Sequence, residues 1–587
     1  MGNHRYRTNR KKSDQLRRHT TGILLVLLLI TQGFSQSIDL EGVSKTGFKG
    51  LRNIGNSGYY VQYMETVIEG KRAFQKVHLS LLDNDLKVTS DFRVPVRETE
   101  TVENVGYNGG KFMLISSSNI KRTRTLTTVD REGNVIATKN FDKVLRRLLE
   151  KPAVILPYGD SDFVVINYLK EKKVGYSVER YDSNLEMKYS TVVIPDKKKL
   201  YPVDFFIADN QMYVLEFLTP DFSDYFEYHL ASYDIETGAE KFKVQLKNEE
   251  SKASGFATFI KPAKGGGVIT GGMFFYGNKA QGEGSNGFFA STISKDGTPK
   301  FTFVDWKEVK KLLKDKSAGF FGGVTRTFMH DIVVNDDGSF TLVGENYREG
   351  LASMAGEKKG AMAKIGGLTS GNTDIAITVA DYALMDFSAS VEFTGIRKLN
   401  EAECITVIKS STEKDQAPYK GQKEILNVAN ILNNQGYFPY RFTMEQGEDK
   451  YLVSVLKYEP QIKELLYFTK LNSATLDTVS VEITSSELRY VRGIMDGMVG
   501  KLGGLGKLAK KGNKNNVANE FVQKRSDDPF DYRAKAQNTR IIPSNVPGKI
   551  VMYDFIPVED PNDKRKGLGK LMAMKGMLRV SYVDMPK

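Results

Sequence analysis

Cysteine, histidine and tryptophan are nearly missing from this chain of 587 residues. The only cysteine is Cys404, which excludes an intramolecular disulfide and any cysteine-based metal cluster. We expect Cys404 to be a buried, unreactive residue of a strand. Two of the five histidines, His4 and His19, lie near the N-terminus, so few remain for a metal centre. We therefore expect no metal site and no cofactor.

Sequence motifs of catalysis are equally scarce. The chain has no Gly-x-Ser-x-Gly elbow, no P-loop, and neither HExxH nor CxxC spacing. The other histidines, His78, His229 and His330, are more than a hundred residues apart. These absences favour a protein that is not an enzyme, without excluding side chains that only the fold brings together.

The N-terminal 35 residues have the layout of a secretory signal peptide. Seven lysines and arginines precede the apolar stretch ILLVLLLI at residues 23–30, which is short for a membrane span. Gly33 and Ser35 are the small residues expected before a cut at Gln36. We expect an exported protein in the periplasm, at the outer membrane or outside the cell. An uncleaved signal anchor is the alternative.

The chain has a net charge of +13, but seven basic residues and one acid lie in residues 1–35. Much of the excess therefore belongs to the targeting segment, and we expect no nucleic-acid partner.

A strand signature recurs along the chain at spacings of 46 to 72 residues. Each copy has two or three turn-forming or polar residues followed by β-branched and aromatic residues. The eight copies begin at Asn56, Gly109, Ser161, Asn210, Gly265, Asp337, Ala402 and Glu448. A second signal, an aspartate between two strands, follows the first four copies at Asp83, Asp130, Asp182 and Asp234.

These aspartates are predicted to build turns, because a carboxylate accepts backbone N–H groups two residues on. Looser versions of the turn follow at Asp296-Gly297, Gly366-Gly367 and Asn472. A calcium loop is the alternative, but Val333 stands where the loop before Gly338 would need an aspartate.

A repeat of four short strands about every fifty residues is typical of a β-propeller blade. We predict an all-β fold, a β-propeller of about eight four-stranded blades. Seven blades are the alternative count, because no clear aspartate turn follows Ala402. Two packed β-domains are the alternative fold.

The predicted parts are a signal peptide at 1–35, propeller repeats at 46–485, a basic Gly/Lys-rich insertion at 486–545, and C-terminal strands at 546–587. The strands beginning at Lys549 and Met577 are expected to complete a blade begun by the N-terminus. Apolar residues at helical spacing predict short helical insertions at 141–151 and 305–316, with a third at 421–436.

Two stretches are candidates for ligand binding. The first, LTPDFSDYFEYH, brings Asp221, Asp224, Tyr225 and Glu227 together. Paired carboxylates beside aromatic rings suit sugar binding or glycosidase chemistry, whereas a solvated hairpin tip is the structural alternative.

The second stretch, residues 492–531, is rich in glycine and lysine. Lys501, Lys507, Lys510 and Lys511 flank apolar residues at helical spacing. Such a segment is predicted to contact an anionic membrane or acidic polymer, or else to be a plain solvated insertion.

In outline, the repeats at residues 46–485 and the GFSQ ending of the signal segment resemble secreted β-propeller-like proteins of Bacteroidota without assigned activity. The resemblance implies an envelope-associated or secreted binding scaffold. It transfers no functional residue, because the chain has no Trp-Asp blade ending and Trp306 is its only tryptophan.

The regular repeat without a catalytic motif favours a non-enzymatic scaffold that binds an envelope protein or glycan. The alternative is a polysaccharide hydrolase or lyase whose carboxylates converge at the propeller channel.

Overall fold

The computed structural model describes most of the chain. The described residues are 36–43, 48–69, 72–97, 99–118, 120–144, 152–170, 173–196, 198–220, 225–279, 285–313, 325–351, 375–399, 404–408, 438–458, 463–473, 475–483, 540–558 and 575–586. No helix within these ranges has the length and apolarity to cross a bilayer. The predicted signal peptide and the candidate helix at 421–436 lie outside them.

The described strands form eight antiparallel sheets, each built on a meander of four strands. The chain is an all-β protein with the fold of an eight-bladed β-propeller, which confirms the predicted class and blade count. Two packed β-domains and seven blades are both wrong. The chain divides into two compact units, with unit 1 comprising Met1–Tyr63, Ser80–Thr89 and Thr539–Lys587, and unit 2 comprising Met64–Leu79 and Ser90–Asn538.

Blades 2 to 7 lie wholly in unit 2. Blade 2 contains β6 (Thr101–Asn108), β7 (Lys111–Ser118), β8 (Thr123–Asp130) and β9 (Val135–Asp142). Blade 3 contains β10 (Val154–Tyr158), β11 (Asp162–Lys170), β12 (Val174–Tyr181) and β13 (Met187–Val193). Blade 4 contains β14 (Lys199–Ala208), β15 (Gln211–Thr219), β16 (Glu227–Asp234) and β17 (Glu240–Gln245).

Two of the next three blades carry an additional strand. Blade 5 contains β18 (Lys247–Asn248), β19 (Ala253–Pro262), β20 (Val268–Tyr276), β21 (Gly287–Ile293) and β22 (Pro299–Asp305). Blade 6 contains β23 (Thr325–Val334), β24 (Phe340–Leu351), β25 (Ile375–Phe387), β26 (Phe393–Leu399) and β27 (Cys404–Ile408). Blade 7 contains β28 (Tyr440–Gln446), β29 (Asp449–Tyr458), β30 (Lys463–Lys470) and β31 (Thr478–Ile483).

Blade 8 joins strands from both ends of the sequence. Its order is β1 (Ser37–Glu41), β34 (Lys575–Asp584), β33 (Lys549–Val558) and β32 (Arg540–Pro543). The expected strands near Lys549 and Met577 therefore share a sheet with the N-terminal β1. Blade 1 contains β2 (Phe48–Asn53), β3 (Tyr59–Glu69), β4 (Arg72–Leu82) and β5 (Val88–Pro95), with a 3-10 turn at Gly55–Ser57 before β3.

Seven of the eight predicted strand entries lead into the second strand of a four-stranded meander (β3, β7, β11, β15, β20, β24 and β29), and the remaining one does not. The entry at Ala402 becomes β27, which pairs with β25 of blade 6 through Ile375↔Ile408 and Val379↔Cys404. The eighth blade is instead the one that contains β1. The sequence signature identified a strand at Cys404 correctly, but a local pattern carries no information on the partner of that strand.

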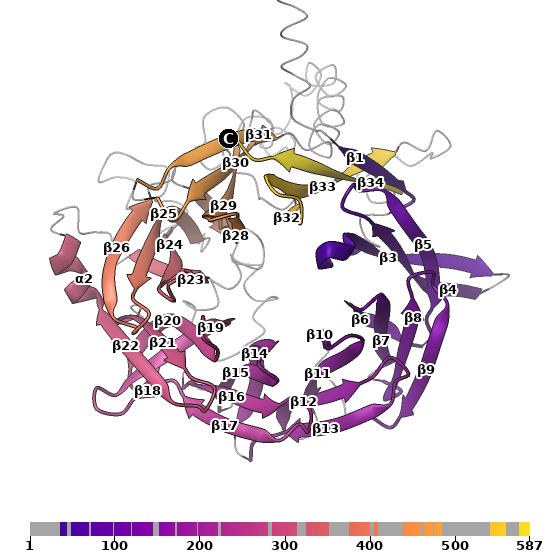
Figure 1. The fold of residues 1–587 in the computed structure, drawn as a ribbon, viewed down its shortest axis with the longest axis horizontal. Helices are drawn as coiled ribbons and strands as arrows, with labels where there is room; N and C mark the ends of the chain where they lie inside the picture. The colour runs from indigo at the N-terminus through magenta and orange to yellow at the C-terminus, as the bar shows by residue number, and fades with distance from the viewer. Residues whose placement is uncertain are drawn as a thin grey trace, which may run out of the picture. The chain divides into compact units, whose positions relative to one another are not determined.

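Successive blades of unit 2 pack through apolar layers. In Figure 1 the strands β6, β10, β14, β19, β23 and β28 of its blades lie on the inner side and β9, β13, β17, β22, β26 and β31 on the outer side. The two middle strands are almost entirely buried, as in β11, where Phe163, Val164, Val165 and Ile166 have no exposed surface. Side chains on the two faces of β11 pack in different apolar layers. Val164 and Ile166 pack against blade 4, and Phe163 and Val165 pack against blade 2.

The predicted aspartate turns are confirmed between the third and fourth strands of four blades. A single carboxylate oxygen, Oδ1, accepts two backbone N–H groups in each: Asp83 from Asp85 and Lys87, Asp130 from Glu132 and Asn134, Asp182 from Asn184 and Glu186, and Asp234 from Glu236 and Thr237. The aspartates are thus structural. Asp296 and Asn472 lie in the equivalent turns of blades 5 and 7, whereas Gly366 and Gly367 lie outside the described residues.

A second recurring set of polar contacts, made by residues at β-bulges, links neighbouring blades. Asn104, Asp204 and Asp331 each stand at a β-bulge in the first strand of a blade, and the side-chain oxygen accepts the next residue's N–H. Each also reaches the following blade. Asn104 Nδ2 donates to the carbonyl of Ala153 at 2.9 Å, Asp204 accepts the N–H of Ile260 at 2.8 Å, and Asp331 accepts the Tyr440 hydroxyl at 2.9 Å.

Helix is rare among the described residues. The helix predicted at 305–316 is confirmed as α2 (Trp306–Leu313), whose Trp306 and Val309 are buried against blades 5 and 6. The helix predicted at 141–151 is wrong at its start, because Phe141 and Asp142 pair with β8 in the sheet. The rest of that stretch, from residue 145, lies outside the described residues.

Candidate functional site

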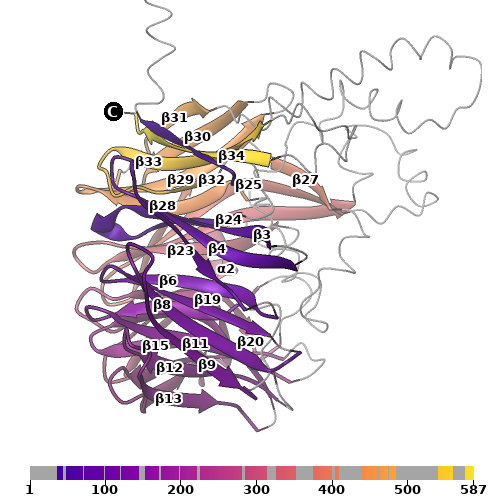
Figure 2. The same cartoon turned by 90° about the vertical axis from the view of Figure 1, so that its right-hand side faces the viewer.

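The two ends of the sheets in unit 2 differ in the length of their longest connections. At one end, the turn end, β6 stops at Asn108 and β7 starts at Lys111, and β16 stops at Asp234 and β17 starts at Glu240. At the other, the connection end, β24 stops at Leu351 and β25 starts at Ile375, and β26 and β28 are separated by residues 400–439. Figure 2 shows β24, β25 and β27 reaching toward this second end.

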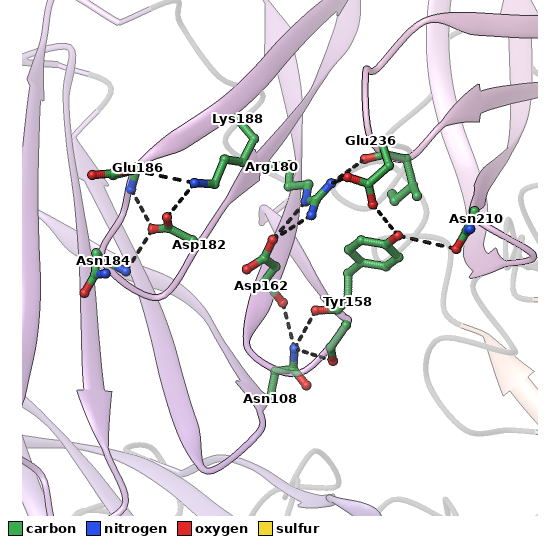
Figure 3. Close-up of polar contacts among 12 residues, drawn as sticks. Asn108, Tyr158, Asp162, Arg180, Asp182, Asn184, Glu186, Lys188, Asn210 and Glu236 are labelled. Carbon is green, nitrogen blue, oxygen red and sulfur yellow. Dashed lines mark hydrogen bonds and ion pairs between the residues drawn. The ribbon is translucent and has the colours of Figure 1, made fainter.

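The turn end is closed by contacts from blade to blade. Asn108 of blade 2 donates to the carbonyls of Tyr158 and Asp162 in blade 3 at 2.9 and 2.8 Å, and the Tyr158 hydroxyl donates to Glu236 of blade 4 at 2.6 Å (Figure 3). The series continues with Gln211 to the Lys295 carbonyl at 3.2 Å, Lys264 to Asp336 at 3.1 Å, and Lys450 to the Val334 carbonyl. The turns thus form an interlocked surface.

Charges at the turn end neutralise each other. Arg180 binds Asp162 at 2.9 Å and Glu236 at 2.6 Å, and its guanidinium lies 4.7 Å from the centre of the Tyr158 ring (Figure 3). Hydrogen bonds from Tyr158 and Arg180 lower the pKa of Glu236, which therefore stays ionised. This network stabilises the junction of blades 3 and 4.

At the connection end the structure brings two of the four predicted ligand-binding residues together. The hydroxyl of Tyr225 donates to Glu227 Oε1, and Lys198 approaches Glu227 Oε2 at 2.7 Å. Lys198 Nζ also lies 5.1 Å from the centre of the Tyr225 ring. Asp221 and Asp224 lie outside the described residues, so the predicted set of three carboxylates is represented by Glu227.

Partial burial acts to raise the pKa of Glu227, but hydrogen bonds from Lys198 and Tyr225 outweigh it, so the pKa lies below its usual value. Burial and the bond to Glu227 raise the pKa of Tyr225 to about 12. At neutral pH Glu227 is therefore an ionised carboxylate that accepts a hydrogen bond from the protonated hydroxyl of Tyr225.

Sequence reasoning missed a second tyrosine–carboxylate pair beside the first. Asn278 Nδ2 donates to the Tyr225 hydroxyl at 3.3 Å, and its carbonyl accepts the N–H of Phe226 at 2.9 Å. Two residues before Asn278, Tyr276 is 46% exposed and its hydroxyl lies 3.4 Å from Asp305 Oδ2. The sequence shows Tyr276 only as a tyrosine at the end of a strand. Its pairing with Asp305 could not be predicted, because Asp305 ends β22, two strands away in the sheet.

Asn278 links the two pairs, because it bonds Tyr225 and follows Tyr276 by two residues. We call the six residues at this end of blades 4 and 5 the tyrosine strip: Lys198, Tyr225, Glu227, Tyr276, Asn278 and Asp305. The carboxylate of Asp305 is fixed from its other side, because its Oδ1 accepts the N–H of Lys307 at 2.7 Å in the first turn of α2. The strip therefore offers two aromatic rings, an ammonium, an amide and two oriented carboxylates.

Polar groups continue inward from the strip between blades 3 and 4. His229 follows Glu227 on the same face of β16 and lies opposite Glu216 in the sheet. Glu216 is fully buried, and it binds Lys243 at 2.5 Å and accepts the Tyr176 hydroxyl at 2.5 Å. Burial and the charge of Lys243 lower the pKa of His229 to about 4, so its imidazole is neutral at pH 7.

Two further buried pairs lie in other blades. Arg124 and Glu179 lie 2.8 Å apart between blades 2 and 3, where Tyr181 also donates to Glu179 at 2.8 Å. His330 and Glu345 lie 2.8 Å apart in blade 6, and His330 stacks on Tyr440 of blade 7 at 4.4 Å between ring centres. Each titratable group has a partner of suitable chemistry, as expected for groups that stabilise a blade junction.

Among the described residues, no group of three or more His, Cys, Asp or Glu side chains is arranged to hold a metal ion. The predicted contact lysines Lys501, Lys507, Lys510 and Lys511 lie outside that part of the chain. The side chain of Cys404 is likewise not described, although Cys404 is the first residue of β27.

Solved structures that match this chain have varied functions. They include the WD40 domain of SCAP from fission yeast (6% identity, 95% of this chain and 98% of that chain, TM-score 0.36). The polysaccharide lyase Uly1 has 10% identity over 94% of this chain and 100% of that chain, with a TM-score of 0.38. A europium-containing methanol dehydrogenase has 8% identity over 94% of this chain and 93% of that chain, with a TM-score of 0.39. At these TM-scores none of them assigns an activity to this chain.

A search of the curated proteins finds no match. A family model does match, and it covers residues 17–464, most of the sequence. The chain therefore belongs to the family described as a family of unknown function, DUF6770.

Proposed function

We propose that the protein is an exported, non-enzymatic propeller scaffold that binds an envelope partner through the connection end of its blades. The observation that carries the proposal is the difference between the two ends. Short turns and blade-to-blade bonds close the turn end, whereas the long connections and the tyrosine strip lie at the other. Binding residues are concentrated on long connections held by a rigid framework.

The pairing of buried charges supports a scaffold. Arg124 of blade 2 and Glu179 of blade 3 form an ion pair across a blade junction. Glu216 pairs with Lys243 inside blade 4 and accepts the hydroxyl of Tyr176 from blade 3. Paired in this way, these groups hold neighbouring blades together, and a rigid framework suits a protein whose task is to present a surface.

Export rests on the basic, apolar and small-residue order of residues 1–35. The periplasm, the outer membrane and the exterior are all compatible with it. N-terminal sequencing of the protein from its native cells tests this part of the proposal. Retention of Met1 would leave a membrane-anchored protein instead.

Anionic surfaces are a further proposed contact, through the lysines at 501, 507, 510 and 511. Binding of the full chain to vesicles with anionic lipid should weaken as salt rises, because screening shortens the reach of these charges. Deletion of residues 493–525 should abolish that binding and leave the β-sheet circular dichroism unchanged.

The role of the connection end is tested by shortening one connection. Leu351 and Ile375 pair directly in the sheet, so residues 352–374 can be replaced by an Asn-Gly turn. Capture of envelope components by the immobilised mature protein should fall, with an unchanged melting temperature. The matched control replaces Asp336 and Asp337, in the turn between β23 and β24 at the turn end of the same blade, and should retain capture.

The opposite result, capture lost only in the turn-end variant, would overturn the proposal. Release of reducing ends or unsaturated sugars from polysaccharide by the purified protein would replace the scaffold with the hydrolase or lyase alternative.

A further inference from the structure

We propose that the tyrosine strip is a binding site for a neutral, hydroxyl-rich polysaccharide, an inference that rests on the proposed scaffold function and names its ligand class. The site spans the ends of blades 4 and 5. Its two tyrosines come from different blades and repeat the same local chemistry. Tyr225 donates to Glu227, and the Tyr276 hydroxyl lies 3.4 Å from Asp305.

Each part of the strip matches a part of a sugar ring. A pyranose has a face of C–H groups that packs on an aromatic ring, and a rim of hydroxyls that both donate and accept hydrogen bonds. Tyr276, with 46% of its surface exposed, supplies an accessible ring. Glu227 and Asp305 supply acceptors, and Lys198 and Asn278 supply donors.

The groups of the strip are held in place before any ligand arrives. Glu227 is fixed by Lys198 at 2.7 Å and by Tyr225, and Asp305 is fixed by the N–H of Lys307 at 2.7 Å. The connection carrying Tyr225 is tied to the next blade, because the N–H of Phe226 donates to the Asn278 carbonyl at 2.9 Å. A prearranged site loses little conformational entropy on binding.

The charge of the strip favours a neutral glycan over an acidic one. It contains two carboxylates, Glu227 and Asp305, and one ammonium, Lys198. The hydrogen bonds of Lys198 and Tyr225 keep Glu227 ionised at neutral pH. A uronate or sulfate group would face the two carboxylates and be repelled.

The same composition disfavours a protein partner. The central part of a protein interface is depleted in charged side chains and excludes water. Here three charged groups lie among two tyrosines, and the Glu227 side chain is 13% exposed and that of Lys198 31% exposed.

The test measures retention of the mature protein in gels containing soluble neutral β-glucan or mannan, with polygalacturonate as the acidic comparison. The protein should be retarded by at least one neutral polymer and not by polygalacturonate. Tyr276→Ala should weaken the affinity about ten-fold, the loss of one stacking contact. Tyr276→Phe keeps the ring and should retain most of the affinity.

Tyr451→Ala is the matched control. Tyr451 makes the same kind of pair, with its hydroxyl 3.3 Å from Asp449 Oδ2, but it lies at the turn end of blade 7. Its removal should leave the retardation unchanged. Circular dichroism melting of each variant confirms that the fold is intact.

Three results would overturn the inference: equal retardation of Tyr276→Ala and the unaltered protein, retardation by polygalacturonate alone, and no retardation by any polymer. Capture of an envelope protein that survives Tyr276→Ala would leave the scaffold proposal standing with a protein partner. A chain that binds neither polysaccharide nor envelope protein would overturn both.

Discussion

His330 Nε2 lies 2.8 Å from Glu345 Oε2, and both side chains are almost completely buried, at 1% and 0% exposed. Burial disfavours charge on each, so it raises the pKa of Glu345 and lowers that of His330. The pair is consequently neutral at pH 7, with a protonated carboxyl group bonded to a neutral imidazole. His330 stands at the β-bulge of β23, and its ring stacks on Tyr440 of blade 7, so the pair lies at the junction of two blades.

Glu345→Ala should therefore be costly and Glu345→Gln mild. Alanine leaves a cavity and removes the partner of a buried imidazole, at a cost of about 3 kcal/mol. Glutamine keeps the shape and a donor to His330, so we expect a loss of about 1 kcal/mol or less. Urea unfolding at pH 7 measures both, and Glu249→Gln, on a side chain 76% exposed, is the control. Equal losses for Ala and Gln would mean that the pair is ionic.

Acid should destabilise the protein in part through His229. Its pKa is about 4 in the folded chain, lowered by burial and by Lys243, against an ordinary value of 6.5. The folded state thus binds fewer protons than the unfolded state between these values, and stability falls as the pH drops from about 6.5 toward 4. The groups that face His229 are Lys243, Lys198, Glu227 and Glu216.

Thermal melting from pH 7 to pH 4 measures this loss. His229→Gln should lose less stability over that window than the unaltered protein, because glutamine takes up no proton. His330 titrates in the same direction and remains in the variant, so part of the acid loss should persist. An identical pH dependence with and without His229 would contradict the assignment.

The four aspartate turns show what a sequence predicts well. Asp83, Asp130, Asp182 and Asp234 act on N–H groups within four residues, so their role is legible in the local sequence. The strand signature is local too, and it located the second strand of the meander in seven blades. It failed at Ala402, because the choice of β25 as partner for β27 depends on the whole blade.

The polar contacts of the candidate site could not be predicted in the same way. Glu216 with Lys243, His330 with Glu345, and Tyr276 with Asp305 join residues on different strands. Each residue alone looks like an ordinary polar position of a strand. Tyr225 and Glu227 were found because they are two residues apart and meet within one connection.

Asp182 offers a direct test of the turn chemistry. Its Oδ1 accepts the N–H groups of Asn184 and Glu186, both at 2.9 Å (Figure 3). Asp182→Ala should cost about 1 to 2 kcal/mol, because two N–H groups lose their acceptor. Asp182→Asn keeps the oxygen and should lose less, mainly the ion pair with Lys188. Denaturant unfolding compares the stability of the two variants, and Asp160→Ala, at an exposed position, is the control. If the alanine variant were as stable as the asparagine variant, the turn would not need the side-chain acceptor.

The last prediction concerns β1 and the position of the cleavage site. β1 pairs along its whole length with β34, the Gln36 carbonyl accepts the N–H of Tyr582 at 3.0 Å, and Asp39 binds Arg579 through two contacts of 2.7 Å. Leu40 is buried in the same apolar cluster as Leu578 and Val580. A mature chain that begins at Gln36 therefore keeps every contact of β1.

A chain that begins at Gly42 lacks β1. It should lose about 2 kcal/mol from the burial of Leu40 alone. It should also aggregate, because β34 becomes an exposed edge strand. Thermal melting and size-exclusion chromatography compare it with the chain that begins at Gln36. Asp39→Ala in the longer chain separates the ion pair from the strand, and it should cost at most about 1 kcal/mol because both side chains are partly exposed. Equal melting temperatures for the two chains, or a native N-terminus beyond Glu41, would show that β1 is dispensable to the blade.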